Sequence, residues 1–412
     1  MFYKSKIINL KSKMAKGVAI TGMGIISSIG NSVEENYISL IENKIGISRI
    51  ENIPTVHADV IKVGEIKKTN EELISELQLS ENNNFSRTAM IGALAAKQAV
   101  ENAGITSINE FRTGLISATS VGGMDMTEKH YFDYFEKPEL VKYITCHDGG
   151  DVAEKIASEL GLKGMVTTIS TACSSAANSI MLGARLIKSG KLDRVIVGGT
   201  DALAKFTING FKTLMILSDD YNKPFDNNRK GLNLGEAAAF LVLESDEIVA
   251  KQNKKVLARV SGYGNANDAF HQTASSENGD GAYLAMKKAF EVSGLKPSEI
   301  DYINVHGTAT PNNDLSEGRA LLRIYEDEKV PDFSSTKPFT GHTLAAAAAI
   351  EAVYSVLAIQ NSVVYPNLNF EVPMEEFELK PQKTLKMKNI EHVLSNSFGF
   401  GGNCSTLIFS KS

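Results

Sequence analysis

The 412-residue chain contains no tryptophan, only three cysteines and ten prolines, and no excess of basic residues. Three scattered cysteines are too few for a disulfide framework, which favours a reducing compartment, the cytoplasm. With 43 basic and 48 acidic residues, the net charge of −5 argues against a nucleic-acid-binding surface. We find no apolar run of the roughly 18–20 residues that a membrane helix needs, so no membrane contact is expected.

Strand-like and helix-like segments alternate along the chain. The strand-like runs are apolar and rich in β-branched residues, and they lie at 194–200, 238–244, 301–308 and 392–398. The helix-like segments lie at 87–104, 281–294 and 345–361. Fully apolar strands alternating with helices predict an α/β protein with layered sheets covered by helices on both faces.

The opening pattern of the chain occurs twice. KGVAITGMGIISSIG (16–30) is a strand followed by Gly-x-Gly, and VLARVSGYGNA (256–266) repeats this order. These glycines lack the spacing of a dinucleotide-binding loop and indicate tight turns instead. We therefore predict two related halves, 16–255 and 256–412. The basic start, residues 1–15, has an apolar part too short for a signal peptide and is predicted to be an extra leader, either disordered or a start that is not native.

One cysteine stands at a strand-to-helix corner. TISTACSSAANSIMLGARLIKSG (168–190) places Cys173 between a β-rich run and good helix material. A thiol in the first turn of a helix lies at the positive end of the helix dipole, which lowers its pKa and favours the thiolate. The alternative is a buried structural cysteine, and the corner alone leaves the two interpretations about equal.

Two of the seven histidines follow apparent strands and stand beside glycine: His306 in NVHGTATP and His342 in STKPFTGHTLAAAAAIE. Each alone is more often a packed core or loop residue. Together with a cysteine at a corner, they resemble a nucleophile with acid–base or hydrogen-bonding partners. The adjacent Cys146 and His147 lack metal-ligand spacing, and Cys404 is interpreted as a packed small residue, so no metal site is predicted.

Four motifs in order, TACSSA, HGTATPNND, STKPFTGH and NSFGFGG, resemble those of the elongating (type II) β-ketoacyl-acyl-carrier-protein synthases of the thiolase superfamily. The resemblance extends from about residue 16 over nearly the whole chain. It implies the α/β thiolase fold, five layers αβαβα in two pseudo-symmetric halves. It also implies a decarboxylative Claisen condensation with malonyl-acyl-carrier-protein, giving a 3-oxoacyl-acyl-carrier-protein. The substrates would be carried on phosphopantetheine, with no cofactor of the enzyme's own.

The resemblance also implies roles for individual residues. Cys173 would accept the acyl group as a thioester. His306 and His342 would donate hydrogen bonds to the enolate that forms as carbon dioxide leaves. Lys337 would hold and tune this histidine site, the alternative being a solvated surface lysine. The backbone N–H groups of Cys173 and Phe400 would form the oxyanion hole.

Further positions match the family's supporting residues. The gating loop would comprise Phe398, Gly399, Phe400 and Gly401. The pantetheine arm would contact Thr308 and Thr310, and the floor of the acyl pocket would be Val121. The structural carboxylates would be Asp314 and Glu317. The positions that can hold a structural monovalent cation in relatives are Asn304, Glu351, Ser395 and Asn396.

The chain departs from the family where glycines are usual: GLNLGEAAAF, GHTLAAAAAIE and Asn313 carry alanine or asparagine. Such changes are similar to those of an aryl-polyene or flexirubin branch, in which a ketosynthase can pair with a chain-length factor. General fatty-acid elongation stays equally open. The rival functions are a thiolase or initiating synthase, a non-condensing partner subunit and a pure binding protein. The expected partners are an acyl carrier protein and a second subunit, either identical or homologous.

Overall fold

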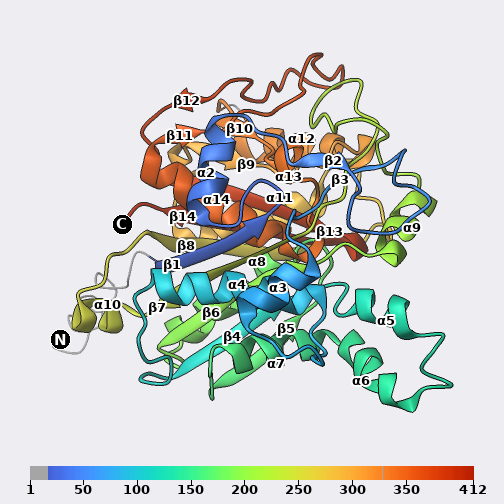
Figure 1. The fold of residues 1–412 in the computed structure, drawn as a ribbon. Helices are drawn as coiled ribbons and strands as arrows, with labels where there is room; N and C mark the ends of the chain where they lie inside the picture. The colour runs from blue at the N-terminus through green and yellow to red at the C-terminus, as the bar shows by residue number, and fades with distance from the viewer. Residues whose placement is uncertain (1–16, 327) are drawn as a thin grey trace.

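The computed structural model describes residues 17–326 and 328–412, so the predicted leader lies outside the described residues. Ten strands form one sheet in the order β10-β9-β13-β14-β8-β1-β7-β6-β4-β5 (Figure 1). The bounds of these strands are β1 Val18–Ser27, β4 Thr113–Ala118, β5 Met165–Ile169, β6 Arg194–Asp201, β7 Ala237–Glu244, β8 Ala258–Asn267, β9 Tyr302–Asn304, β10 Asp332–Ser334, β13 His392–Gly399 and β14 Asn403–Ser410.

The sheet consists of two halves with one topology. Numbered within its own half, each set of five strands is arranged in the spatial order third, second, fourth, fifth, first. In both halves the second strand pairs in parallel with the third and fourth, and the fifth pairs antiparallel with the fourth and first. The two first strands, β1 and β8, pair antiparallel where the halves meet. The predicted pseudo-symmetry is confirmed.

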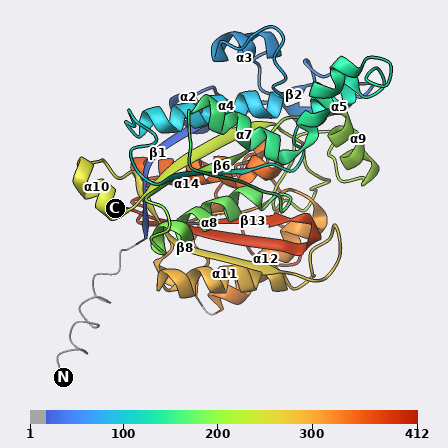
Figure 2. The same cartoon turned by 90° about the horizontal axis from the view of Figure 1, so that it is seen from below.

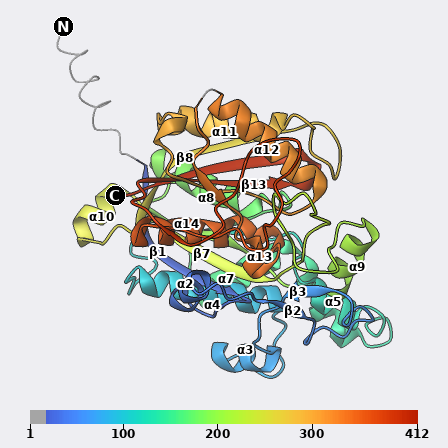
Figure 3. The same cartoon turned by 90° about the horizontal axis from the view of Figure 1, so that it is seen from above.

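Helices form three layers around these half-sheets (Figures 2 and 3). The first half is covered on its outer face by α4 (Arg87–Asn102) and α7 (Gly149–Glu159). The second is covered by α11 (Asp280–Ser293) and α12 (Pro311–Tyr325). Between the halves lie α8 (Ser175–Lys188) and α14 (Ala347–Asn361), which contact each other and strands of both halves. This is the five-layered αβαβα arrangement that the sequence predicted.

The central helix α14 is apolar on all sides because it lies between two sheets. All of its residues from Ala347 to Ile359 are buried. Residues Leu344–Asn361 are, by length and composition, apolar enough to cross a membrane, so the expectation that no such run exists is wrong on that criterion. However, 89% of this segment is buried inside the fold, as in the core helix of a globular protein.

Most predicted elements are found close to their predicted positions, but the run 301–308 is a strand only over Tyr302–Asn304. It ends early because the backbone N–H groups of His306 and Gly307 donate to the Glu317 carboxylate instead of a strand ladder. The remaining elements are α2 Val33–Ile41, β2 Ile47–Arg49, β3 Lys62–Gly64, α3 Asn70–Leu77, α5 Met124–His130, α6 Val141–Ile144, α9 Lys205–Thr213, α10 Asp246–Gln252, α13 Lys337–Thr340, β11 Val363–Val364 and β12 Lys386–Met387.

Candidate active site

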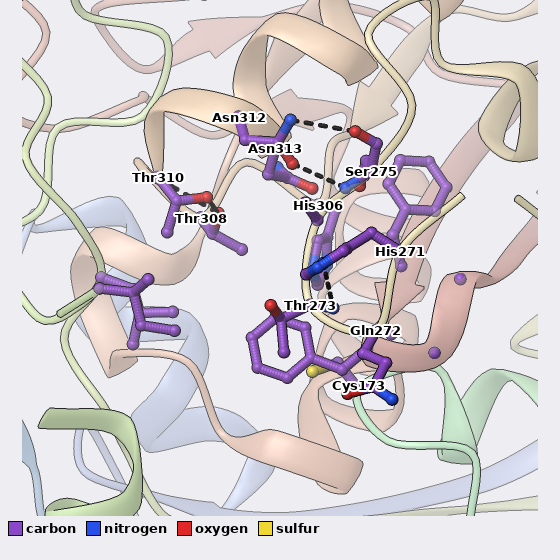
Figure 4. Close-up of a pocket in the computed structure, with 18 of the residues that line it drawn as sticks. Cys173, His271, Gln272, Thr273, Ser275, His306, Thr308, Thr310, Asn312 and Asn313 are labelled. Carbon is purple, nitrogen blue, oxygen red and sulfur yellow. Dashed lines mark hydrogen bonds between the residues drawn. The ribbon is translucent and has the colours of Figure 1, made fainter. Parts of the chain in front are cut away.

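A cavity of about 320 Å³ gathers side chains from both halves of the fold (Figure 4). The predicted site residues that line it are Cys173, His306, His342, Thr308, Thr310, Phe398, Gly399, Phe400 and Gly401. The predicted residues that do not line it are Lys337, Asp314, Glu317, Glu351, Asn304, Asn396 and Val121. The structure therefore brings the thiol and both histidines to one cavity, although they are far apart in the sequence.

The thiol projects from a strained turn between β5 and α8. The helix begins at Ser175 with Ser174 as its N-cap, so Cys173 precedes the helix, and the prediction that it lies in the first turn is wrong. Ala172, just before it, has φ +51°, which is unfavourable for a residue with a side chain. Ser175 Oγ supports the turn, accepting from Thr171 N–H at 2.8 Å and donating to the Ala172 carbonyl at 2.5 Å.

The electrostatics of Cys173 differ from the sequence prediction. Burial raises the pKa of the thiol to about 11, and the positive charge of Lys337 and the backbone N–H groups of Phe400 and Cys173 offset only part of this shift. The prediction of a lowered thiol pKa is therefore wrong, because removal from water outweighs the favourable dipoles. The backbone N–H groups of Phe400 and Cys173 nevertheless lie close enough to the sulfur to lower its pKa, so both are available as donors to the carbonyl oxygen of an acyl group attached there.

The hydrogen bonds of His342 determine its tautomer. Its Nδ1 accepts from the backbone N–H of Leu344 at 3.0 Å, in a turn where Leu344 has φ +55°. Burial and the nearby charge of Lys337 lower the pKa of His342 to about 3, so the ring is neutral at neutral pH. A neutral imidazole that accepts at Nδ1 carries its proton on Nε2. His342 is thus a fixed hydrogen-bond donor at Nε2.

His306, which follows β9 in the same half of the fold, faces the same cavity as His342. Its ring centroid lies 5.4 Å from that of His342, with the ring planes nearly perpendicular, and 5.6 Å from the ring of Phe398. Burial, followed by the charge of Lys337 and the proximity of His342, holds the pKa of His306 well below its usual range. Its Nδ1 is buried and has no hydrogen-bond partner among the described residues. The cavity therefore contains two neutral imidazoles.

Lys337 is a buried charge and not a surface lysine. It is 2% exposed, and its Nζ lies 2.5 Å from Oε1 of Glu351, which is equally buried. Ser397 Oγ donates to the other carboxylate oxygen of Glu351 at 3.4 Å. Lys337 does not line the cavity, but its charge lowers the pKa values of Cys173, His306 and His342.

The carboxylates of Asp314 and Glu317 hold backbone turns. Glu317 accepts from the N–H groups of His306 and Gly307, each at 2.8 Å. Asp314 accepts from Phe225 N–H at 2.8 Å and from Ala309 N–H at 3.2 Å. Both side chains are buried away from the cavity wall, in positions that suit a structural role.

The segment Phe398–Gly402 packs directly against the turn that carries Cys173. A side chain on Gly399 would place its Cβ 2.7 Å from the carbonyl oxygen of Thr171, so only glycine fits there. Phe400 stacks on Phe211 of α9 with ring centroids 5.9 Å apart, and Gly401 adopts φ +81°. On the opposite wall, the hydroxyls of Thr308 and Thr310 lie 2.8 Å apart.

One loop of the cavity wall, residues 271–275, was not predicted from the sequence. The one feature that could have pointed to it is its position shortly after the repeated Gly-x-Gly opening. Gly401 N–H donates to the Gln272 carbonyl at 2.7 Å. Ser275 N–H donates to Oδ1 of Asn312 at 2.7 Å (Figure 4). Cys404 also lines the cavity, and burial raises the pKa of its thiol, in keeping with a packing role.

Val121 borders a different cavity, of about 480 Å³, beside the edge strand β5. It packs in an apolar cluster with Leu232, which lines the cavity of Cys173. Its role as the floor of an acyl pocket stays a prediction.

The predicted cation positions also stay untested. Asn304 Oδ1 is buried without a partner among the described residues, as an oxygen ligand could be. Asn396 Oδ1, however, already accepts from Thr406 Oγ1, and Glu351 is held by Lys337. Ser395 is buried beside them. Within residues 17–326 and 328–412, no group of three or more His, Cys, Asp or Glu side chains could hold a metal ion.

Comparison with known proteins identifies the relatives of this chain. Residues 15–248 match the family described as beta-ketoacyl synthase, N-terminal domain, and residues 257–371 match beta-ketoacyl synthase, C-terminal domain. The chain is 34% identical to 3-oxoacyl-[acyl-carrier-protein] synthase 2 of Staphylococcus aureus (strain COL), covering 96% of this chain and 98% of that protein. It is 32% identical to the protein of that name in Vibrio cholerae, covering 96% and 99%.

Solved structures agree with this relationship. The ishigamide ketosynthase/chain length factor superimposes with a TM-score of 0.90 and 29% identity over 96% of this chain and 99% of that chain. A ketosynthase in complex with its chain length factor from Xenorhabdus doucetiae gives a TM-score of 0.81 and 28% identity over 96% and 98%.

Proposed function

The chain belongs to the β-ketoacyl synthase family, and we propose which residue acts in each step of the condensation. The protein is a condensing acyltransferase that joins an acyl group to a malonyl-derived unit held on an acyl carrier protein. The observation that carries the assignment is the meeting of Cys173, His306 and His342 at one cavity.

Acyl transfer comes first. The sulfur of Cys173 attacks the thioester carbonyl of the acyl carrier protein, a new C–S bond forms, and the carrier thiol leaves with the proton of Cys173. The carbonyl oxygen, negatively charged in the tetrahedral intermediate, accepts hydrogen bonds from the N–H groups of Cys173 and Phe400, both of which lie beside the sulfur. The product is an acyl-enzyme thioester with the chain in the cavity.

Decarboxylation and condensation follow. The C–C bond to the malonyl carboxylate breaks, carbon dioxide leaves, and the electron pair moves to the thioester oxygen as an enolate. His342 Nε2–H donates to this oxygen, because its Nδ1 is occupied by Leu344 N–H, and His306 provides the second contact. The enolate carbon then attacks the acyl carbonyl on Cys173 and expels the thiolate. Burial and, after it, the charge of Lys337 lower the pKa values of both imidazoles and so keep them neutral.

Separate assays of the two half-reactions test these roles. Cys173→Ala should abolish acyl loading measured by intact-protein mass spectrometry, whereas His342→Ala should impair malonyl decarboxylation more than loading. Cys146→Ala is a matched control, since that buried cysteine lies outside the cavity. Equal loss of loading in the Cys173 and His342 variants would contradict the assignment.

The carrier protein must reach the mouth of the cavity. Phe211 on α9, together with Ile216 just beyond it, lines the cavity, while Phe206 on the same helix is 63% exposed. Lys205 and Lys212 are also exposed on α9. Exposed basic and apolar side chains beside the cavity suit an acidic carrier protein, so α9 is the proposed docking surface.

A second subunit is proposed to cover the outer edge of the sheet. The edge strand β5 has no neighbour on one side in the sheet order, and its Met165 is 40% exposed. Phe132 and Phe135, following α5, are 84% and 65% exposed. Unpaired edges and exposed aromatic groups are usually covered in a native assembly. Light scattering on the isolated chain distinguishes a homodimer from a subunit that needs a homologous partner.

The pathway is proposed to be fatty-acid elongation or polyene synthesis in the cytoplasm. The second candidate is favoured by the two structural neighbours, which are ketosynthases named together with chain length factors. A panel of carrier proteins bearing saturated, unsaturated and aryl-polyene acyl groups tests the choice, because the group that loads fastest onto Cys173 identifies the natural chain.

A further inference from the structure

A single asparagine side chain connects the two segments that surround the thiol. Asn403 is the first residue of β14, three positions after Phe400. Its Oδ1 accepts from Ser174 Oγ at 2.8 Å, from Asn178 Nδ2 at 3.0 Å and from Asn265 Nδ2 at 2.8 Å. Ser174 directly follows Cys173, so one acceptor joins the nucleophile turn to the strand that leaves the gating loop.

The donors around Asn403 hold the nucleophile turn in their own right. Asn178 Nδ2 also donates to Thr171 Oγ1 at 2.8 Å, and Ser174 Oγ donates to the Thr171 carbonyl at 2.8 Å. Asn265 Nδ2 additionally reaches Asn178 Oδ1 at 3.1 Å. The network therefore links α8 of the first half with β8 and β14 of the second half, directly behind Cys173.

The position of this network matters because the two N–H groups at the sulfur come from different halves of the fold. One belongs to Cys173, and the other belongs to Phe400. Between Phe400 and Asn403 lie Gly401 and Gly402, with φ +81° and +78°, a conformation in which glycine is preferred. Because two glycines allow many backbone conformations, the loop does not by itself fix the position of Phe400 N–H. An anchoring contact is therefore needed where the loop ends.

We propose that Asn403 is a positioning residue that sets the spacing of the two oxyanion-hole N–H groups. It acts through Ser174 on the Cys173 side and as the anchor of the gating loop on the Phe400 side. This inference rests on the proposed function, because the spacing matters only for transfer of an acyl group to Cys173. His306 and His342 make no hydrogen bond to the network among the described residues, so decarboxylation does not depend on it.

Substitution of Asn403 tests the inference with a built-in control. Asn403→Ala removes the acceptor that the three donors share and leaves each donor with only its other partners, so the link between the nucleophile turn and β14 is lost. Removing one oxyanion-hole donor costs about 10²–10³-fold in rate, so displacement of Phe400 N–H should slow acyl loading by about 10–100-fold. Malonyl decarboxylation, measured separately by carbon dioxide release, should change less than about twofold. Asn403→Asp keeps the Oδ1 acceptor for all three donors and should restore loading to within a few fold.

Two further variants, Asn265→Ala and Asn389→Ala, serve as a second test and as a control. Asn265→Ala removes one of the donors to Asn403 at an exposed position and should slow acyl loading by a smaller factor than Asn403→Ala does. This variant still tests the inference if Asn403→Ala does not fold. Asn389→Ala, at an exposed site away from the cavity, should match the unaltered enzyme. Normal loading by Asn403→Ala, or an equal fall in loading and decarboxylation, would overturn the positioning role. Failure of the unaltered enzyme to load any acyl group would instead refute the proposed function.

Discussion

The helix dipole predicts a lowered pKa for the Cys173 thiol, whereas its burial in the structure raises that pKa. The structure places the thiol pKa at about 11, raised by burial from an ordinary value of 9.0. At pH 7.5 a thiol with that pKa is thiolate to only about 3 parts in 10⁴, about a hundredfold less than an unperturbed thiol. Since deprotonation creates the charge, the thiolate fraction should rise about tenfold with each pH unit until pH approaches the pKa.

Alkylation of the resting enzyme by iodoacetamide measures this fraction. The rate of mass increase, followed by intact-protein mass spectrometry from about pH 6.5 to 9.5, should rise with unit slope and show no plateau. Cys173→Ala gives the background from Cys146 and Cys404, both of which are buried. Lys337→Met removes a charge that lowers the thiol pKa, so its alkylation should be slower at every pH. A plateau below about pH 8 would show that the dipoles outweigh burial and would refute the reasoning.

Other substitutions test the surroundings of the site. Lys337→Met leaves Glu351 as an unpaired buried carboxylate and should lower the free energy of unfolding, measured in urea, by about 3–5 kcal/mol. The double variant Lys337→Met/Glu351→Leu should recover most of this stability, and an equal loss in the single and double variants would contradict the prediction. Gly399→Ala forces a Cβ against the Thr171 carbonyl and should slow acyl loading at least about tenfold, so an unchanged rate would argue against close packing. Lys212→Glu should raise KM for the carrier protein with kcat unchanged, and an unchanged KM would remove α9 as the docking surface.

Local patterns were sufficient to predict much of the fold and the members of the site. The β-branched run before Cys173 and the small helix-forming residues after it predict the corner, and glycine beside His306 and His342 predicts access to a cavity. The repeated opening at 16–30 and 256–266 becomes β1 and β8, the first strands of two halves with identical strand order. These features depend on neighbours within about ten residues, which a sequence displays directly.

The remaining features depend on contacts between distant segments. The pKa of Cys173 is raised by burial, and much of the wall around the thiol consists of residues from the second half of the chain. The local sequence around Cys173 indicates only the helix dipole, which has the opposite effect on the pKa. The pairing of Lys337 with Glu351 joins α13 to α14, and nothing in STKPFTGH identifies that partner. Asn403 likewise has no distinctive local pattern, because its three donors lie between 138 and 229 positions away.

The buried charge of Lys337 affects all three side chains for which we propose a role in the reaction. A positive charge beside the cavity favours the thiolate of Cys173 and disfavours protonation of His306 and His342, so one group acts in the useful direction on all three. An enolate forming at the histidines gains from the same charge. Glu351 makes the lysine tolerable inside the protein, since an unpaired ammonium there would be costly. Lys337 thus acts on the site through its charge, although no lysine or arginine side chain of the described residues lines the cavity.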